Sequence, residues 1–199
     1  MSQSGTTSSD ERGPYIWLAS GRKYFFLNPS PDDVVLEDIL AGLHQLRWTG
    51  QAHVVGDLLV HSSRVALIAK RLGGTPQECA TALFHDAHEA YLGDVSRPLK
   101  MAMKALVMSN ARSPYSILED AGKAVVAERF RLVYPHPEIV HLADNIVLAW
   151  EAILWGKDLD EAGLSRPDDQ TLALLNDTPV HGWMTEADMR AWDRQIKNS

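Results

Sequence analysis

The chain has 199 residues, of which 45% are hydrophobic and 23% charged, and its formal net charge is −7. This length fits one globular domain, and the composition is that of an ordinary soluble protein. The negative charge argues against non-specific binding to a nucleic-acid polymer or an anionic membrane. A single cysteine excludes an internal disulfide framework and a cysteine-rich zinc site.

The first 14 residues are rich in Ser, Thr and Gly and contain no apolar run. We expect residues 1–14 to form a disordered tail without a signal peptide, and residues 15–199 to form a single domain. The apolar stretch Ile139–Trp155 is too short and too polar to cross a membrane, so a cytoplasmic location is the simplest interpretation.

Tyr15–Leu27 has aromatic and β-branched runs on either side of Ser20-Gly21-Arg22, which predicts a small β-hairpin.

Hydrophobic spacing predicts helices through most of the remaining chain. The first helix is expected to begin with Asp32 or Asp33 as its N-cap and to reach Leu46. A second is expected from Asp57 to Leu72, and its inward face is expected to carry Leu58, His61, Val65, Ile68 and Leu72. The sequence Thr75-Pro76-Gln77-Glu78 is typical of a helix start, and this third helix is expected to end near Gly93.

Further helices are predicted toward the C-terminus, the last of them with Thr185 as its N-cap. Their expected ranges are Leu99–Met108, Tyr115–Val133, Glu138–Trp155, Thr171–Leu175 and Thr185–Lys197. The predicted fold class is therefore all-α, a bundle of about six or seven helices with a small N-terminal β-hairpin.

Ionisable side chains interrupt the third expected helix over residues 83–94. On a helix, the adjacent His85 and Asp86 would point about 100° apart, and Glu89 would lie one turn away on the same side. Burying such groups is costly unless an ion or a partner compensates them. The alternative interpretation is a solvated polar stripe.

Four side chains are candidate ligands for a metal ion: His61, His85, Asp86 and Asp144. Taken singly, His61 is also explained as a satisfied core histidine, and Asp144 as a buried carboxylate paired with a helix cap or an arginine. Together, two imidazoles and two carboxylates suit a borderline divalent ion, with positions left for water and substrate.

The order His61, His85-Asp86, Asp144 resembles the H…HD…D pattern of the HD-domain metal-dependent phosphohydrolases. The resemblance covers about Ser20 to Trp155 and is closest to the bacterial 5′-deoxynucleotidase branch and its phage relatives. An HD dipeptide alone is a weak signal, whereas the whole linked set is specific. The further matching positions are Arg47-Trp48, Ser62, Ala87, His88, Glu89, Gly93-Asp94, Pro98 and Lys100.

The resemblance implies a role for each of these positions. The four ligands would hold one divalent transition metal, namely Co, Mn or Zn, with Mg, Fe or Ni as alternatives. Glu89 would orient a water or exchange a proton, and Asp94 would hydrogen-bond water or the deoxyribose 3′-hydroxyl. Arg47 would clamp phosphate, Trp48 would pack on the sugar or base, and Lys100 would be a further phosphate contact.

These roles have structural alternatives. Asp94 is also explained as a turn residue, Arg47 as a charge at a helix end, Trp48 as a core residue and Lys100 as a solvated lysine. His88 is expected to lie behind the ligands or to face solvent.

The function implied by the resemblance is hydrolysis of the 5′-phosphate ester of 2′-deoxynucleotides, with 5′-monophosphates giving deoxynucleoside and phosphate. The alternative is a deoxynucleoside triphosphohydrolase, acting for example on dATP and releasing tripolyphosphate. A third hypothesis is a non-catalytic HD module that binds a nucleotide and regulates a partner. The resemblance also permits a homodimer, and it implies a small-molecule substrate rather than a polymer or a membrane.

Overall fold

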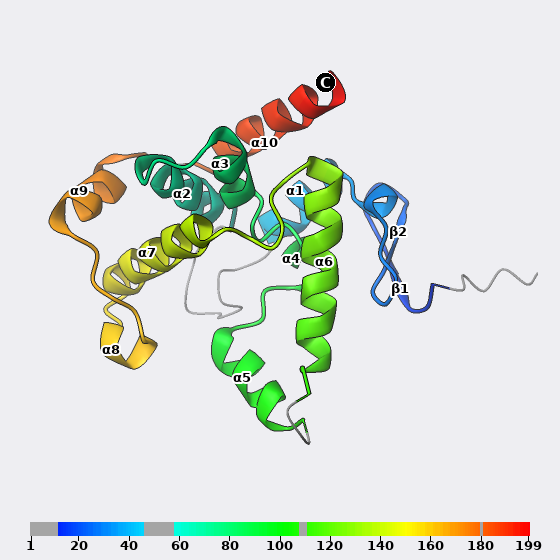
Figure 1. The fold of residues 1–199 in the computed structure, drawn as a ribbon, viewed down its shortest axis with the longest axis horizontal. Coiled ribbons are helices and arrows are strands. Elements are labelled where there is room, and N and C mark those ends of the chain that lie inside the picture. The colour runs from blue at the N-terminus through cyan, green and yellow to red at the C-terminus, as the bar shows by residue number, and fades with distance from the viewer. Residues whose placement is uncertain (1–11, 46–57, 108–110, 180) are drawn as a thin grey trace, which may run out of the picture.

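A computed structural model of the chain describes residues 12–45, 58–107, 111–179 and 181–199, and these ranges are mostly helical (Figure 1). Their elements are β1 (Tyr15–Trp17), β2 (Lys23–Phe25), the 3-10 helix η1 (Pro31–Asp33), α1 (Leu36–Gln45), α2 (Leu58–Arg71), α3 (Pro76–Leu83), α4 (Glu89–Leu92), α5 (Arg97–Ala105), α6 (Pro114–Phe130), α7 (Glu138–Leu154), α8 (Leu159–Ala162), α9 (Asp169–Asp177) and α10 (Gly182–Lys197). The predicted all-α class with an N-terminal hairpin is confirmed. The described helices outnumber the six or seven expected, mainly because one predicted helix is divided and the short α8 was not anticipated.

The hairpin pairs β1 with β2 in antiparallel register, with Ile16 opposite Tyr24. Tyr24 and Phe25 are buried, whereas Trp17 points outward and is 67% exposed. The hairpin therefore contributes one face to the core, although two strands alone would be only marginally stable in water.

Two helix starts show how local sequence sets the boundaries. The Thr75 hydroxyl accepts from the Glu78 backbone N–H at 3.2 Å, and the Glu78 carboxylate accepts from the Thr75 N–H at 2.8 Å. The predicted capping box is confirmed, with Pro76 at the first helical position. Asp33 does not cap α1: it belongs to η1, where its carboxylate accepts from the N–H of Ser30.

Thr185 was expected to cap the last helix, and this is wrong. It lies inside α10, whose N-cap position is His181, and its hydroxyl donates to the carbonyl of Leu59 at 2.8 Å. The hydroxyl therefore ties α10 to the start of α2.

The third predicted helix is divided in two. Helix α3 ends at Leu83, residues 84–88 form turns, and α4 begins at Glu89. Phe84 leaves helical geometry at φ −106° and ψ 8°, with its N–H shared between two carbonyls of α3. Because neither glycine nor proline marks this break, the sequence pattern did not reveal it. His85 and Asp86 thus lie in a buried turn rather than on a helix.

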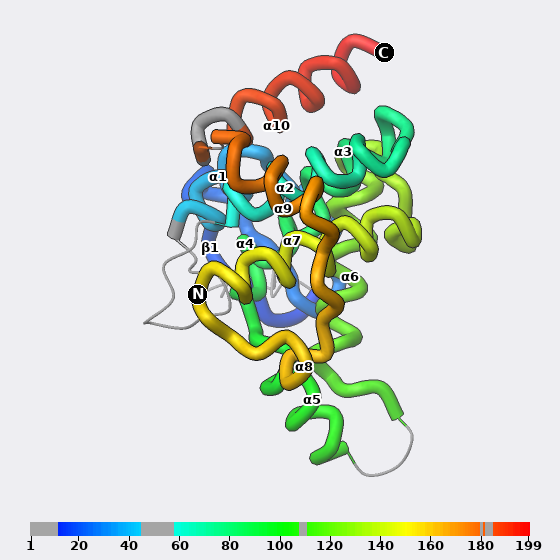
Figure 2. Tube along the Cα trace, turned by 90° about the vertical axis from the view of Figure 1, so that its left-hand side faces the viewer, coloured from blue at the N-terminus to red at the C-terminus, as the bar shows by residue number. Residues whose placement is uncertain are grey.

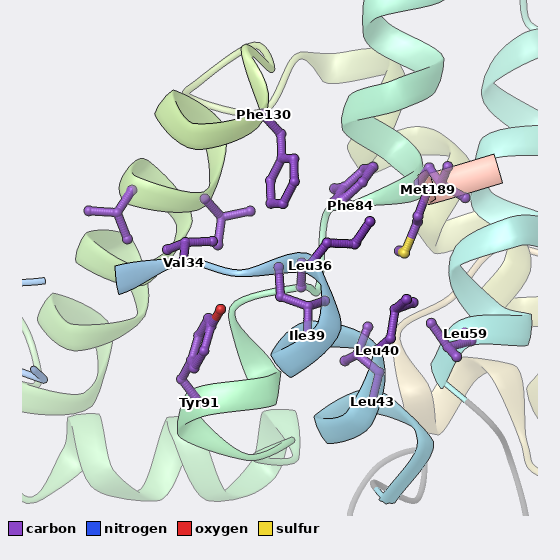
Figure 3. Close-up of a cluster of buried hydrophobic side chains, with 14 of the residues drawn as sticks. Val34, Leu36, Ile39, Leu40, Leu43, Leu59, Phe84, Tyr91, Phe130 and Met189 are labelled. Carbon is purple, nitrogen blue, oxygen red and sulfur yellow. The ribbon is translucent and has the colours of Figure 1, made fainter. Parts of the chain in front are cut away.

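Two clusters of apolar side chains form the core. The larger brings α1 against α4, α6 and α10, and Figure 3 shows Leu36, Ile39, Phe84, Phe130 and Met189 converging there. The second lies between α2, α3, α7 and α9 and includes Val65, Ile68, Ala82, Val147 and Leu175. The predicted inward face of α2 is confirmed from Leu58 to Ile68, but Leu72 at its end is 41% exposed.

Helix α5 differs from these packed helices because none of its residues is buried. It lies at the opposite end of the molecule from α10 (Figures 1 and 2). Among the described residues, no helix combines the length and the apolar character needed to cross a membrane.

Candidate metal centre

The structure brings the four predicted ligands together from three separate segments. His61 lies on α2, His85 and Asp86 in the turn between α3 and α4, and Asp144 on α7. Helices α2, α3 and α7 pack against one another, and in Figure 1 they lie between α9 on the left and α6. Residues more than 80 positions apart in sequence therefore meet at one point.

The distances between the ligand atoms are short. Nε2 of His61 lies 3.1 Å from Oδ1 of Asp144 and 4.0 Å from Oδ2 of Asp86. Nε2 of His85 lies 3.0 Å from the same Asp86 oxygen and 3.7 Å from the same Asp144 oxygen. His61, His85 and Asp86 each offer a ligand atom within 4.8 Å of the others. Donors at about 2.1 Å from a shared ion lie about 3 to 4 Å apart, so this spacing fits one ion.

The tautomer of His85 gives a second indication that an ion belongs here. Its Nδ1 donates to the carbonyl of Ala82 at 2.8 Å, and since a carbonyl only accepts, Nδ1 carries the proton. Within the part of the chain that the structure describes, Nε2 is buried without a hydrogen-bond partner, yet it faces two carboxylate oxygens. A lone pair facing anions is unfavourable unless a proton or a metal ion lies between them. The donor set and its geometry therefore fit a divalent ion.

The histidines and carboxylates of the site strongly shift one another's pKa values. Burial lowers the pKa of His85, but Asp86 and Asp144 outweigh it and raise that pKa to about 10. Burial likewise opposes ionisation of Asp86, but the neighbouring histidines hold its pKa below the usual range. Since a bound divalent ion replaces these protons, metal binding here must release protons.

The ligand set opens toward solvent on one side. The side chains of His61 and His85 are only 2% and 6% exposed, whereas those of Asp86 and Asp144 are 22% and 29% exposed. An ion held by all four would therefore be covered on the imidazole side and accessible on the carboxylate side. In zinc proteins generally, catalytic sites keep an open coordination position whereas structural sites are closed.

Glu89 lies just behind the ligands at the start of α4. Its side chain is buried, and Oε2 has no hydrogen-bond partner among the described residues. Burial raises the pKa of Glu89 well above its usual value, and the charges of Asp86 and Asp94 raise it further. The raised pKa favours the protonated form of this carboxyl, and a carboxyl with a perturbed pKa beside possible metal ligands is a candidate general acid or base. Asp94 follows Gly93 at the end of α4, so the two predicted catalytic residues are near neighbours.

Comparison with known proteins adds a family but no activity. Over 139 residues the chain is 31% identical to the uncharacterized protein YfdR of Escherichia coli, a match that covers 69% of this chain and 70% of YfdR. The chain belongs to the same family as YfdR. It is also 33% identical over 146 residues to the uncharacterized protein RCAP_rcc00048 of Rhodobacter capsulatus, covering 68% of this chain and 69% of that protein. No family model matches the chain. Membership of the YfdR family thus leaves the function to be argued from the site.

Lys100, a predicted phosphate contact, is not free in this YfdR relative. Its Nζ donates to Oε1 of Glu119 on α6 at 2.7 Å, and Lys123 donates to the same oxygen at 3.3 Å. Burial lowers the pKa of Lys100, but Glu119 outweighs it and raises the pKa, with smaller contributions from Glu89 and Asp86. Lys100 therefore lies within electrostatic reach of the ligands while remaining anchored to α6.

His88 was expected to lie behind the ligands or to face solvent, and the structure places it in the interior. It is 1% exposed, and its Nε2 lies 3.6 Å from Oε1 of Glu119. Burial lowers the pKa of His88, which favours the neutral ring. Glu119 thus connects His88, which precedes α4, with Lys100 on α5 and Lys123 on α6. Sequence reasoning missed it because a glutamate four residues before a lysine on a helix is typical of a solvent-exposed pair.

Glu151 is the second residue that the sequence analysis missed. Its two carboxylate oxygens lie 3.0 and 3.2 Å from Nδ1 of His61, and its side chain is only 6% exposed. It follows Asp144 by seven residues, or two helical turns, and this spacing was the available signal.

The predicted Arg47 and Trp48 lie outside the described residues, so their roles stay predictions.

A groove of about 710 Å³ lies between α2, α3 and α10. It is lined by apolar side chains such as Ala66, Leu83 and Trp192 together with Lys70 and Asp188. None of the four candidate ligands lines it, so the candidate metal centre rests on the chemistry of its side chains and not on the size of a cavity.

Proposed function

We propose that this chain is a metal-dependent phosphohydrolase that cleaves the 5′-phosphate ester of 2′-deoxynucleotides, with deoxynucleoside 5′-monophosphates as the preferred substrates. The observation that carries the proposal is the convergence of His61, His85, Asp86 and Asp144, in which each imidazole Nε2 lies 3.0 to 4.0 Å from an oxygen of both carboxylates. Two imidazoles and two carboxylates with one accessible side are the donor set expected for hydrolytic metal chemistry. The resemblance to HD-domain phosphohydrolases supplies the substrate class.

The chain's own residues divide the work of this reaction. His61, His85, Asp86 and Asp144 would hold the ion, and a divalent ion bound there lowers the pKa of a coordinated water and polarises a phosphoryl oxygen. Glu89 accepts a proton at its buried Oε2, or returns one to the leaving oxygen of the deoxyribose, because its raised pKa makes both protonation states accessible. Asp94, at the exit of α4, holds a water or the 3′-hydroxyl.

The placement of the cations favours a monophosphate over a triphosphate. Lys100 and Lys123 share the carboxylate of Glu119, so these three groups together supply only one net positive charge. The guanidinium of Arg64 lies over the Trp150 ring at 4.4 Å, and Lys104 is solvent-exposed on α5. Among the described residues, this is modest compensation for a tripolyphosphate carrying three or more negative charges.

Glu89 argues against a non-catalytic nucleotide-binding module. Burying a carboxyl beside two other acidic groups is costly, and nucleotide binding alone gives no reason to retain it. Proton transfer at the site does give a reason, because a general acid or base works best when its pKa lies near the working pH.

The test is a substrate panel on chelator-treated protein reloaded with Mn²⁺, Co²⁺ or Zn²⁺. We expect inorganic phosphate from deoxynucleoside 5′-monophosphates, little from the corresponding ribonucleotides, and no tripolyphosphate from dNTPs. Asp86→Ala, purified identically, should lose the activity while keeping its helical circular dichroism. Tripolyphosphate release would favour the triphosphohydrolase instead. Activity that survives in Asp86→Ala with added metal would contradict the proposal.

A further inference from the structure

The imidazole of His61 is held between two carboxylates of the same helix. Asp144 lies 3.1 Å from Nε2, and Glu151 lies 3.0 Å from Nδ1. Both come from α7, seven residues apart, whereas His61 comes from α2. An imidazole that binds an ion through Nε2 still carries a proton on Nδ1, which needs an acceptor because the ring is buried.

The two carboxylates differ in what else they face. Oδ1 of Asp144 also lies 3.7 Å from Nε2 of His85, so Asp144 faces the point that the ligands share. Both oxygens of Glu151 lie within hydrogen-bond distance of His61 Nδ1, on the opposite edge of the ring. Asp144 therefore belongs with the ion, and Glu151 belongs behind the histidine.

Burial makes Glu151 difficult to explain as a stabilising residue alone. A carboxylate in the interior is costly, and Arg64 compensates this one only from a distance. Burial lowers the pKa of Arg64, and the charge of Glu151 partly opposes that shift. The guanidinium lies over the Trp150 ring, and its Nε makes no hydrogen bond to any residue that the structure describes. Glu151 makes its short hydrogen-bonding contact with Nδ1 of His61 and not with Arg64.

His85 provides an internal reference for this arrangement. Its Nδ1 donates at 2.8 Å to the carbonyl of Ala82, a neutral backbone acceptor. In both histidines Nδ1 lies at hydrogen-bond distance from an acceptor and Nε2 faces the other candidate ligands. The acceptor at His61 is a carboxylate side chain, whereas the acceptor at His85 is a backbone carbonyl. A carboxylate acceptor makes an imidazole a stronger donor to a metal than a carbonyl does.

We propose that Glu151 is a positioning residue that fixes the Nδ1–H tautomer of His61 and thereby sets the affinity of the site for its ion. The inference rests on the proposed metal site, but it does not depend on which phosphate ester is hydrolysed. Glu151 touches neither the ion nor the substrate and acts only through the ring of His61.

Ion binding by chelator-stripped protein tests this directly, with Mn²⁺ and Zn²⁺ as the titrants in calorimetry. Glu151→Leu should weaken binding about 10- to 100-fold, the usual effect of losing such a supporting contact. Glu151→Gln keeps an acceptor but loses the charge, so its loss should be smaller. Glu138→Gln removes one charge from the exposed first turn of α7 and should leave the affinity within about twofold.

A measurement on the Nδ1 proton of His61 separates positioning from simple stabilisation. In the Zn²⁺-loaded proteins Nε2 of His61 is held by the ion, so ¹⁵N spectra should show a proton on Nδ1 in both the wild type and Glu151→Leu. The Nδ1–H signal should be protected from exchange with water in the wild type and broadened by exchange in Glu151→Leu. His85 should be unchanged in both proteins. If Glu151→Leu does not fold, Glu151→Gln decides the question. Unchanged affinity and an equally protected Nδ1–H of His61 in the folded variants would overturn the inference.

The outcomes distinguish this inference from the proposed function. If the ion binds with the expected dependence on Glu151 but no deoxynucleotide is hydrolysed, the proposed function fails and the inference holds. If hydrolysis is found and Glu151 variants bind the ion normally, only the inference fails. A wild-type chain that binds neither ion would contradict both.

Discussion

The two sides of the site are built in different ways. On the ligand side, α7 buries seven of its residues, including Ala143 and Val147 on either side of Asp144 in sequence. On the side of the predicted phosphate contact, α5 buries none, and Lys100 reaches the molecule through an ion pair with Glu119. Core packing can hold ligand atoms to a fraction of an ångström, whereas a partly exposed ion pair contributes little and adjusts easily. For the proposed function, this contrast predicts a rigid metal site beside an adaptable end for the substrate phosphate.

The sharpest way to test the rigid side is to change its chemistry without changing its shape. Glu89→Gln keeps the size of the buried side chain and removes its ability to exchange a proton. We expect kcat to fall by about 10²- to 10⁴-fold with little change in ion affinity. Steady-state kinetics together with metal analysis checks this. Unchanged kcat would remove Glu89 from proton transfer.

In the metal-free protein, the raised pKa of His85 should make the free energy of unfolding depend on pH. The pKa of His85 is raised from 6.5 to about 10, so its contribution is complete below pH 6.5 and is lost as the pH rises toward 10. Denaturant unfolding of chelator-treated protein should therefore give a free energy of unfolding that falls across this window. Saturating Zn²⁺ should remove the fall, because the ion replaces the proton. A metal-free stability that stays flat between pH 6.5 and 10 would contradict the coupling.

The close packing of α1 against α4, next to Glu89, should not tolerate a larger side chain. A Cβ added at Gly42 on α1 would lie 2.7 Å from the Cβ and 2.9 Å from the Cα of Ala90 on α4. We expect Gly42→Ala to destabilise the protein by about 1–3 kcal/mol despite the better helix propensity of alanine. At the neighbouring exposed position, Ala41→Gly should cost about 1 kcal/mol through propensity alone. If Gly42→Ala is stabilising in thermal unfolding, the crossing of α1 and α4 is looser than described.

The adaptable side should give the smallest effect. Lys100→Met removes a cation near the predicted phosphate position, and we expect KM to rise about tenfold, corresponding to roughly 1.4 kcal/mol, with kcat nearly unchanged. Lys104→Met on the exposed face of the same helix is the matched control and should change neither constant. Equal effects of the two substitutions would show that only the general charge of α5 matters.

The sequence predicted which of these side chains meet better than it predicted the backbone that carries them. The order of His61, His85-Asp86 and Asp144 along the chain was sufficient to nominate residues that the structure brings together. The break at Phe84 was missed because helix ends are recognised mainly through Gly and Pro, and tertiary contacts decided this one.

The supporting residues were missed for a different reason. Glu151 and Glu119 are single acidic residues on helices, and a sequence alone cannot tell a buried carboxylate from an exposed one. Their partners, His61 and Lys100, lie 90 and 19 residues away, so only the folded chain reveals the pairs. Thr185 fails for the same reason: its hydroxyl is used in a long-range contact with α2 instead of a helix cap.

The most direct test of the central claim is the number of ions bound per chain. Equilibrium titration of chelator-stripped protein with Mn²⁺ or Zn²⁺ should give one site in the wild type and no measurable site in Asp86→Ala, with the helical circular dichroism of the variant retained. Because His61, His85, Asp86 and Asp144 share one point, removing one oxygen donor should abolish the site rather than shift it. A wild type that binds no ion, or an Asp86→Ala variant that binds one with unchanged affinity, would contradict the account.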